Sequence, residues 1–597
     1  MDNQNTRNMI LAGVLTVLIL LGWDMAMRYF YPNADAPKPA ASAPAETPAA
    51  NGESAEAAPR TREGGLTNPA DIATEARDIK TALASPNRVK IEAPGLSGSL
   101  NLVGGMVDDL STNRHTAALD QAQGLQRIYS PAGTPAQQYA QFGWTAGEGG
   151  APVAVPNAQT LWTAPAGAKL TPQTPVTLSW NNGAGVTFTL TYAIDADYML
   201  TVTQGVSNGG AAPVAVKPVA QINRTDKTAA IDSFNVHAGP FGAFDEVVSF
   251  GPDYDELVES PTTAMAGAPN WIGFTDIYWM STLIPEKPGA ASDFRSLGGG
   301  IFLANLFYPQ ATIAPGQQTQ RVTRLFAGAK ETDVLDRYED SGIPNFGLAI
   351  DWGWFRWFEK PLFALLKWLF EAVGNFGVAI MLLTLIVRAV MFPIAQKQFA
   401  SMAAMKAIQP KMKALQERYK DDKQKQQQEI MALYKKEGVN PLAGCLPIFL
   451  QIPVFFALYK VLILSVEMRH QPFALWIKDL SAPDPAHFLN LFGLLPFEVP
   501  AFLGIGVLAL LLGITMWLQF KLNPAQMDPV QQQVFAIMPW IMMFIMAPFA
   551  AGLLLYWITS NVLTIGQQAY LYSKHPQLKA QAEKDAEDAK RAKGRAK

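Results

Sequence analysis

The sequence has little of what most catalytic or cross-linked proteins require. Cys445 is the only cysteine in 597 residues, so no intrachain disulfide can form. None of the five histidines falls in a long apolar run, and the five apolar runs of the C-terminal half contain no aspartate or glutamate. No carboxylate pair, Ser–His dyad or zinc site is therefore expected inside a membrane, which argues against a membrane protease.

Nucleotide-driven and carrier-type activities have equally little support. The sequence contains no Gly-x-x-x-x-Gly-Lys-Ser/Thr loop, so ATP binding through a P-loop is not expected. Inverted repeats, which many secondary transporters carry, are not recognisable. We therefore expect a protein that is not an enzyme and that has neither a cofactor nor a metal site.

Charge is unevenly distributed along the chain. The net charge is only −3, but residues 396–440 carry ten Lys and Arg against five Asp and Glu, and residues 574–597 carry eight against four. Basic segments next to apolar runs lie in the cytoplasm under the positive-inside rule. The remaining, acidic part of the chain is then predicted to be exported.

The N-terminal end is predicted to hold an anchor and a linker. Residues 9–23 form an apolar run without a recognisable cleavage site after it, so residues 1–28 are predicted to be an uncleaved signal-anchor helix. The following residues, 29–84, are predicted to be a linker. The reason is that their Ala/Pro-rich part, residues 34–58, cannot bury enough apolar surface to fold.

Residues 85–345 have the pattern of a β domain. Residues 186–194 alternate apolar with small or polar side chains, as in a half-buried strand. Asn181-Asn-Gly183 predicts a turn before this strand, and many similar short segments lie between Gly and Pro turns. This pattern predicts a large exported all-β sandwich.

Apolar stretches dominate the C-terminal half. The predicted spanning helices are residues 376–394, 446–465, 499–520, 534–547 and 552–570. With the anchor they make six, which places both termini in the cytoplasm and agrees with the charge distribution. Residues 375–572 are thus a five-helix core followed by a basic cytoplasmic tail, residues 573–597. The fourth stretch has only 14 residues, which predicts local thinning of the bilayer. A helix that extends back through residues 531–533, and is then long enough to span, is the alternative.

Two helical segments flank the first of these stretches. Residues 346–374 crowd tryptophan and phenylalanine before Pro361, with a few charges interspersed. This composition predicts an amphipathic helix in the exported membrane interface, and an extended start of the next span is the alternative.

Residues 396–438 are predicted to form a cytoplasmic helical hairpin. An apolar seam runs through Met402, Met405, Ile408, Met412, Leu415 and Tyr419. Asp421-Asp422 interrupts it and can cap a second helix, residues 423–437, which ends at Gly438. Such a basic hairpin is commonly just a solvated surface, and a docking arm is the functional alternative.

Arg388 is the residue that bears most directly on function. It lies inside the stretch 376–394, where a charge costs about 2.5–3.5 kcal/mol at the centre of a spanning helix. One interpretation is a side chain that extends to the nearer interface. Thr384, one turn earlier on the same face, favours instead a polar surface directed into the protein.

Polar residues recur on single faces of the other predicted helices. The candidate lining of a shared hydrophilic groove is Arg388, Thr384, Gln451, Gln519, Ser560 and Thr564. Hydrogen bonding between helices would explain any one of these residues by itself. Met538, Met542 and Met546 form a stripe at helical spacing. Core packing is its ordinary role, and adaptable contact with apolar substrate segments is the alternative.

Several short motifs resemble the YidC/Oxa/Alb family of membrane protein insertases. They are Leu383-Thr-Leu-Ile-Val-Arg388, Gln409-Pro-Lys411, Met431-Ala-Leu-Tyr434, Asn440-Pro-Leu-Ala-Gly-Cys-Leu-Pro447, Ala474-Leu-Trp-Ile-Lys-Asp-Leu480 and Tyr556-Trp-Ile-Thr-Ser-Asn561. The large exported domain is similar to that of the Gram-negative bacterial form.

The resemblance implies a five-helix core around a hydrophilic groove, with the family's arginine at Arg388, and a β-supersandwich as the exported domain. It implies insertion of nascent membrane proteins into the bacterial inner membrane, alone or with the Sec translocon. Further expected partners are membrane lipids and, through the basic hairpin and tail, the ribosome. A small-solute transporter or channel and an assembly scaffold are the alternatives.

Overall fold

The computed structural model describes most of the chain from Arg60 to Lys574. The described residues are 60–119, 123–150, 152–231, 236–287, 289–420, 422–438, 446–487, 504–522 and 529–574. The predicted signal anchor, the Ala/Pro-rich stretch and the basic tail after Lys574 lie outside them.

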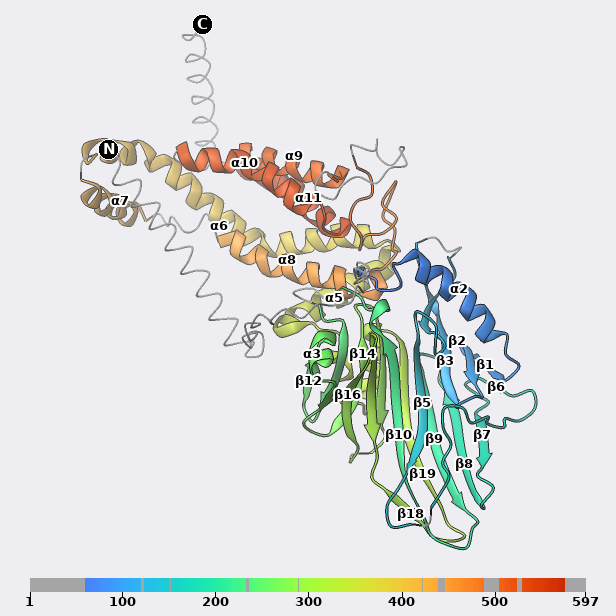
Figure 1. Cartoon of the computed structure of the whole chain (residues 1–597). Coiled ribbons are helices and arrows are strands. Elements are labelled where there is room, and N and C mark those ends of the chain that lie inside the picture. Colours follow the sequence, from blue (N-terminus) through green and yellow to red (C-terminus); the bar gives the residue numbers. More distant parts are fainter. Residues whose placement is uncertain are drawn as a thin grey trace, which may run out of the picture. The chain divides into compact units, whose positions relative to one another are not determined.

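The β domain consists of two mainly antiparallel sheets that pack against each other (Figure 1). The larger sheet has the order β13 (Thr262–Ala264), β16 (Ala291–Gly298), β17 (Ile301–Phe307), β10 (Val214–Thr225), β5 (Gln138–Ala146), β3 (Met106–Thr116), β2 (Leu96–Asn101), β1 (Arg88–Glu92) and β6 (Lys169–Leu170), with β18 (Ala311–Ile313) on β10 and β4 (Leu125–Tyr129) on β3. The smaller sheet has the order β12 (Val247–Phe250), β11 (Gly239–Phe244), β14 (Pro269–Thr275), β15 (Trp279–Pro285), β19 (Gln318–Ala329), β9 (Met199–Asn208), β8 (Val186–Ile194) and β7 (Val176–Asn181). The predicted β-sandwich is therefore confirmed.

Strand β8 illustrates how the sequence pattern specifies the sheet. Every second residue of Val186–Ile194 is buried, as its alternation predicts. The turn before it is closed by Asn182, whose side-chain oxygen accepts hydrogen bonds from the N–H groups of Ala184 at 2.8 Å and Val186 at 3.1 Å. Gly183 takes a φ of +76°, which only glycine adopts without strain. The result is the β7–β8 hairpin.

Residues 60–84, predicted as the end of a linker, are folded, so the linker prediction is wrong for this part. Asn68 caps helix α2 (Pro69–Leu83) by accepting a hydrogen bond from the N–H of Ala70 at 2.9 Å. Glu75 on its inner face accepts a hydrogen bond from the N–H of Ala136 at 2.8 Å. Contacts with the β domain, along which α2 lies in Figure 1, stabilise a helix that composition alone does not indicate.

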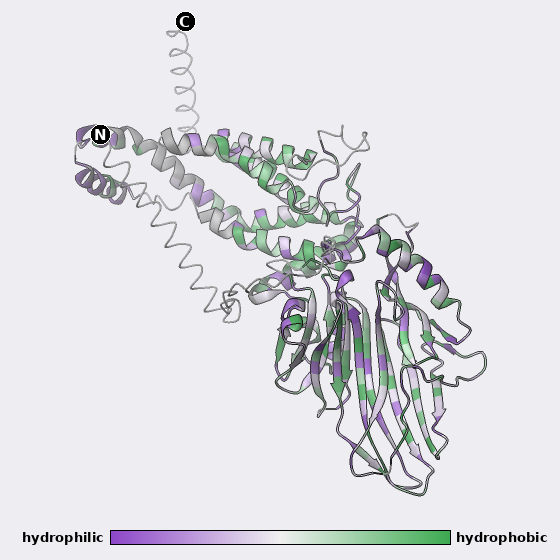
Figure 2. Ribbon diagram, viewed as in Figure 1, coloured by the Kyte–Doolittle hydropathy of each residue, from purple (hydrophilic) through white to green (hydrophobic). Residues whose placement is uncertain are grey.

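The described chain also contains short and long helices. The short ones are η2 (Asp226–Thr228), α3 (Tyr254–Glu259), α4 (Thr332–Asp340), η3 (Phe346–Ala349), η4 (Gly353–Phe355) and η6 (Val466–Met468). The long ones are α5 (Arg356–Val373), α6 (Phe376–Arg418), α7 (Lys423–Glu437), α8 (Leu446–Leu464), α9 (Val507–Leu522), α10 (Pro529–Met546) and α11 (Ala551–Lys574). Figure 2 shows α9 to α11 as mainly hydrophobic and α7 as hydrophilic.

One described stretch, Phe376–Gln398 of α6, has both the length and the apolar composition to cross a membrane. Gln451–Leu464, Val507–Leu522 and Ala536–Met546 are shorter apolar helices. They coincide in position with three of the predicted spans.

Two predicted helix boundaries are wrong. Helix α6 does not end near residue 394 but continues to Arg418, so one helix joins the first apolar stretch to the first arm of the hairpin. Helix α10 begins at Pro529 instead of Val534, because residues 531–533 are good helix formers despite being polar. Its 18 residues extend about 27 Å, so helix length no longer requires a thinned bilayer.

The second helix of the hairpin has the predicted ends. The side chain of Asp422 accepts a hydrogen bond from the N–H of Lys425 at 3.0 Å, and Gly438 ends α7 with a φ of +64°. Ile408 of the predicted seam is buried, and the Tyr434 hydroxyl lies 3.2 Å from the Met412 sulfur. Helices α6 and α7 therefore contact each other at Met412 of the predicted apolar seam.

A buried ion pair allows a test of stability in the β domain. Arg224 is 1% exposed and donates from Nη2 to both carboxylate oxygens of Asp276, at 2.8 and 2.7 Å. Asp276→Ala should destabilise the domain by about 3–5 kcal/mol, because it leaves a buried guanidinium without its counterion. Thermal unfolding of the full chain in detergent measures the effect. The matched control is Glu92→Ala, which breaks the exposed Lys169–Glu92 pair at 3.2 Å and should cost less than about 1 kcal/mol. Equal losses in the two variants would contradict the prediction.

Candidate functional site

The side chain of Arg388 is directed from α6 to α11. Its Nε donates a hydrogen bond to the hydroxyl oxygen of Ser560 at 3.1 Å, and its Nη2 contacts the same oxygen. Ser560 is buried, whereas Arg388 is half-buried. The guanidinium is thus held between helices by a neutral hydroxyl. Helices α8 to α11 contain no acidic residue at all, so they supply no carboxylate to neutralise it.

Helix α11 is also joined to α8 and α9 by polar contacts. Gln451 of α8 donates from Nε2 to the hydroxyl of Tyr556, which lies one turn before Ser560. Asn561 of α11 donates from Nδ2 to the hydroxyl oxygen of Thr515 of α9 at 3.2 Å. We call Arg388, Gln451, Thr515, Tyr556, Ser560 and Asn561 the polar cluster.

The polar cluster is not fully satisfied. Within the described residues, Oε1 of Gln451 is buried and has no hydrogen-bond partner. A buried amide oxygen without a partner costs about 1–3 kcal/mol. Such an atom calls for water or for a polar group brought by a binding partner.

The structure brings together some of the predicted groove residues and separates others. Arg388 and Ser560 are in contact, and Thr564 donates its hydroxyl hydrogen to the backbone oxygen of Ser560 at 2.7 Å. Thr384 is buried and donates to the carbonyl of Ile380 in its own helix at 2.7 Å, so it lines no open surface. Gln519 is half-buried on α9, and no described hydrogen bond links it to the polar cluster.

Three members of the polar cluster, Thr515, Tyr556 and Asn561, were missed as site residues. Asn561 follows Ser560 directly, and Tyr556 lies on the Ser560 stripe of α11. The signal for both was available, because large polar side chains in an apolar helix are rare without a partner. Their partners on α8 and α9 lie more than 45 positions away, and only the fold identifies them.

The methionine stripe is only partly accessible. Met538 and Met542 are half-buried, whereas Met546 is 2% exposed and lies in the core. The prediction that Met546 offers a contact surface is therefore wrong, because α10 turns this end toward the neighbouring helices. The exposed apolar side chains of α10 are instead Ile537, Trp540, Ile541, Phe544 and Ile545.

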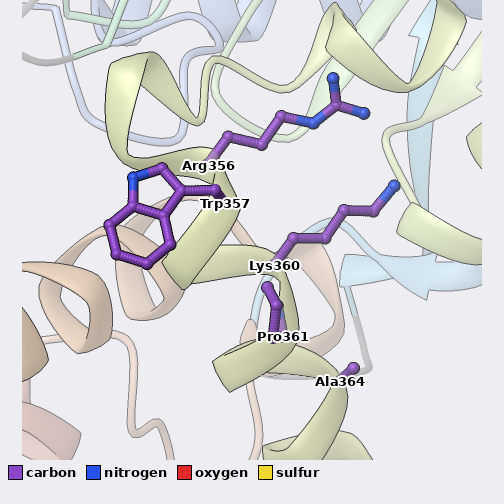
Figure 3. A pocket seen from close by; sticks show the side chains of 5 residues that line it. All are labelled: Arg356, Trp357, Lys360, Pro361 and Ala364. Carbon is purple, nitrogen blue, oxygen red and sulfur yellow. The ribbon is translucent and has the colours of Figure 1, made fainter.

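Helix α5 is amphipathic in the manner expected of the membrane interface. Trp357 and Trp368 are 70% and 62% exposed, whereas Phe363 and Leu366 are buried. A hollow of about 630 Å³ lies on its surface, and Figure 3 shows Arg356 and Lys360 extending to one side of it and Trp357 to the other. Basic and tryptophan side chains together suit the lipid headgroup region.

Two ion pairs fasten α5 to the end of the β domain. Lys360 contacts Asp336 of α4 at 2.8 Å, and Lys367 pairs with Asp333. On the inner side of α5, Glu359 is 2% exposed. Burial raises the pKa of Glu359 from 4.5 to about 7; the charge of Lys460 opposes this rise and Asp351 adds to it.

Segments far apart in sequence meet at residues 465–487. Arg62 donates from Nη1 to the carbonyl of Ser481 at 2.5 Å and from Nη2 to the hydroxyl of Tyr278 at 2.6 Å. Arg469 donates from Nη1 to the carbonyl of Thr116 at 2.8 Å. These contacts join the segment before α2, the β domain and the loop after α8, which we call the junction loop (residues 465–487).

Glu359 should make stability depend on pH. Its folded pKa of about 7 exceeds the ordinary 4.5, so the folded protein keeps a proton that the unfolded chain releases. Stability contributed by this proton is present below about pH 4.5 and is lost as the pH rises to about 7. At pH 8, Glu359→Gln should therefore raise the unfolding temperature and increase the free energy of unfolding by up to about 3 kcal/mol. At pH 4.5 it should change both quantities little.

The measurement is thermal unfolding of the full chain in detergent at both pH values. Glu371→Gln, an exposed position on the same helix, is the matched control and should have no effect at either pH. A Glu359→Gln variant with the same pH dependence as the unchanged protein would contradict the prediction.

Comparisons with known proteins cover both halves of the chain. A family model described as 60Kd inner membrane protein matches residues 368–579, and one described as YidC periplasmic domain matches residues 88–365. A membrane protein insertase YidC of Zymomonas mobilis is 42% identical over 579 residues, covering 96% of each chain. One of a Ruegeria species is 46% identical over 501 residues, covering 80% of this chain and 82% of its own.

A solved structure is also similar. A crystal structure of an active YidC insertase, with its first transmembrane domain resolved, has 20% identity and a TM-score of 0.36, and covers 81% of this chain and 92% of its own. The sequence matches extend over nearly the whole chain at well above 30% identity. The chain therefore belongs to the YidC family of membrane protein insertases.

Proposed function

We propose that this chain inserts nascent membrane proteins into the bacterial inner membrane, with Arg388 and its polar neighbours as the place where a substrate's polar end first enters the membrane. The observation that carries the proposal is that Arg388 has a neutral hydrogen-bond partner. Its described hydrogen-bond partner is the neutral hydroxyl of Ser560, and helices α8 to α11 contain no acidic residue. Its positive charge is therefore not neutralised by these helices and remains available to a substrate.

The depth of Arg388 supports this role. It lies 12 residues after the start of α6, or about 18 Å along the helix. If α6 begins at the exported interface, this is past the middle of a hydrocarbon core about 30 Å thick. A polar tail that enters from the cytoplasm would then reach Arg388 after crossing less than half of the core.

Charge and hydration would together lower the cost of this entry. A carboxylate is attracted more strongly to a guanidinium in a low-dielectric site than in water. The unsatisfied oxygen of Gln451 supports a hydrated site, with Gln519, Ser560 and Thr564 along the same groove. In this proposal Arg388 is the central residue of the site, and Thr384, buried one turn earlier on the same helix, supports it structurally.

The apolar part of a substrate would leave through the lipid-facing side of α10. Met538 and Met542 can adapt to different side chains, and Ile541 and Phe544 extend the apolar surface. Transfer of a substrate's apolar surface into lipid contributes about 25 cal/mol per Å². This gain supplies the driving force without ATP.

The topology that fits this function has six spanning helices. Residues 1–28 would be the signal anchor, the β domain periplasmic, and both termini cytoplasmic, as the basic residues of 396–440 and 574–597 suggest. The hairpin and the tail would bind the ribosome, and the Sec translocon would be a partner for longer substrates. Helix α5 would contact membrane lipids.

Removal of the Arg388 charge should impair insertion selectively. Arg388→Ala should slow the insertion of substrates with acidic tails by about tenfold or more, equivalent to about 1.4 kcal/mol. Arg388→Lys should retain most activity because it keeps the charge. Protease protection of substrate tails in proteoliposomes measures insertion.

The matched control for Arg388 is Lys521→Ala. Lys521 is a cation of α9 that lies 4.8 Å from the ring centre of Trp517, outside the polar cluster. This variant should insert the same substrates at the normal rate. Normal insertion of acidic-tailed substrates by Arg388→Ala would show that the side chain merely extends to the interface.

The hairpin is expected to recruit substrates without supporting the fold. Replacing residues 403–438 by a short linker should strongly weaken co-sedimentation with ribosomes carrying nascent chains, while leaving the unfolding temperature within a few degrees. The control is the double variant Lys411→Glu, Glu437→Lys, which preserves the 2.7 Å ion pair and the net charge with the signs exchanged. Insertion and co-sedimentation that survive the deletion would contradict this role.

A further inference from the structure

The junction loop holds a set of ligand atoms that the insertion function does not use. Glu63, His470 and Asp479 each offer one donor atom, and these three atoms lie within 4.8 Å of one another. A hollow of about 550 Å³ adjoins all three side chains. Glu63 comes from the segment before α2, more than 400 positions from the other two residues.

Each donor is oriented by a partner of its own. Arg469 donates from Nε at 3.1 Å and from Nη2 at 2.5 Å to the same oxygen, Oε2 of Glu63, which leaves Oε1 directed at His470. Oδ1 of Asp479 accepts hydrogen bonds from the N–H of Ser481 at 2.8 Å and from its hydroxyl at 2.7 Å. Such outer partners are typical of metal ligands.

The hydrogen bonding of His470 leaves one ring nitrogen bare. Nδ1 lies 3.4 Å from the hydroxyl oxygen of Thr116, and that hydroxyl donates its own hydrogen to the carbonyl of Ala118 at 2.9 Å. The Thr116 oxygen can therefore only accept from Nδ1–H, which places the lone pair of the neutral ring on Nε2. Nε2 lies 3.7 Å from Oε1 of Glu63, so this lone pair is available to bind a cation beside the carboxylate.

The separation between His470 and Glu63 leaves room for an ion between them. Nε2 of His470 lies 3.7 Å from Oε1 of Glu63, too far for a direct hydrogen bond. His115 and Glu331 provide the comparison, since their 2.9 Å separation is that of a shared proton. Two ligands of a tetrahedral Zn²⁺ lie about 3.3 Å apart, which follows from bond lengths of about 2.0–2.2 Å.

The donors of the site suit a divalent transition metal. Of the two Glu63 oxygens, Arg469 donates to Oε2 only, and Arg62 donates to the backbone carbonyl of Ser481. Lys478, which also borders the hollow, is exposed to solvent. One imidazole with two carboxylates is a donor set that suits zinc and similar transition metals.

We propose that Glu63, His470 and Asp479 bind one Zn²⁺ ion or a similar divalent transition metal, which fastens the segment before α2 to the junction loop. Water from the adjoining hollow would complete the coordination. The ion would act on structure, holding the β domain against the loop between α8 and α9, and it takes no part in the insertion step.

The test uses the full chain in detergent, without an affinity tag and in a Cys445→Ser background, so that no other strong ligand competes. After chelator treatment, Zn²⁺ binding is measured by competition with a chromophoric chelator, and geometry by the visible absorption of Co²⁺. We expect one ion per chain and a rise in the unfolding temperature. Glu63→Gln, His470→Gln and Asp479→Asn should each weaken binding at least tenfold and remove this rise.

The variants Glu63→Gln and Asp479→Asn can keep their hydrogen bonds to Arg469 and Ser481, and unfolding in the presence of chelator checks that they fold. His115→Gln is the matched control, because His115 pairs with only one carboxylate, that of Glu331. This variant should bind Zn²⁺ as the unchanged protein does. The proposal fails if no saturable one-to-one binding occurs, if the three variants bind normally, or if Ca²⁺ binds as tightly as Zn²⁺.

Discussion

The organisation of the helical region depends on one charge placed in an apolar environment. Helices α8 to α11 contain no carboxylate, and a neutral hydroxyl of α11 holds the guanidinium of Arg388. An ion pair in this position would be stable and inert, because each charge would satisfy the other. A guanidinium held by a hydroxyl is costly to keep and available to bind, which is the physical basis of the proposed role in insertion.

Helix α11 makes this arrangement possible. Within one and a half turns it presents Tyr556 to α8, Ser560 to α6 and Asn561 to α9. Each contact joins two helices that are otherwise apolar, and each sets the rotation of α11 relative to its neighbour. A shift of α11 would therefore change all three contacts together, so the polar cluster links the proposed substrate site to the packing of these helices.

The β domain is joined to the helices by specific polar contacts as well as by packing. Arg62 and Arg469 each bridge the β domain and the junction loop, while Lys360 and Lys367 hold α5 to α4. Helix α5, with its exposed tryptophans, thus lies on the chain between the β domain and α6. A motion of the β domain would be transmitted to the start of α6 and so to the helix that carries Arg388.

Much of this protein could be predicted from its sequence, because the relevant signals are local. Period-two alternation specified strands such as β8, Asp422 and Gly438 specified the ends of α7, and the placement of Arg388 in an apolar stretch identified the central residue of the candidate site. Helix ends were harder to predict. Polar residues at the start of α10 and the continuation of α6 to Arg418 showed that a change in composition need not end a helix.

Only the tertiary structure decided which residues meet. The folding of α2 depends on its contact with the β domain, the burial of Met546 depends on the neighbours of α10, and the partners of Asn561 and Gln451 lie on other helices. The same holds for Glu63, His470 and Asp479, which are brought together across more than 400 positions. Sequence patterns report how one segment faces its surroundings, whereas side-chain pairing over long separations is set by the packing of complete elements.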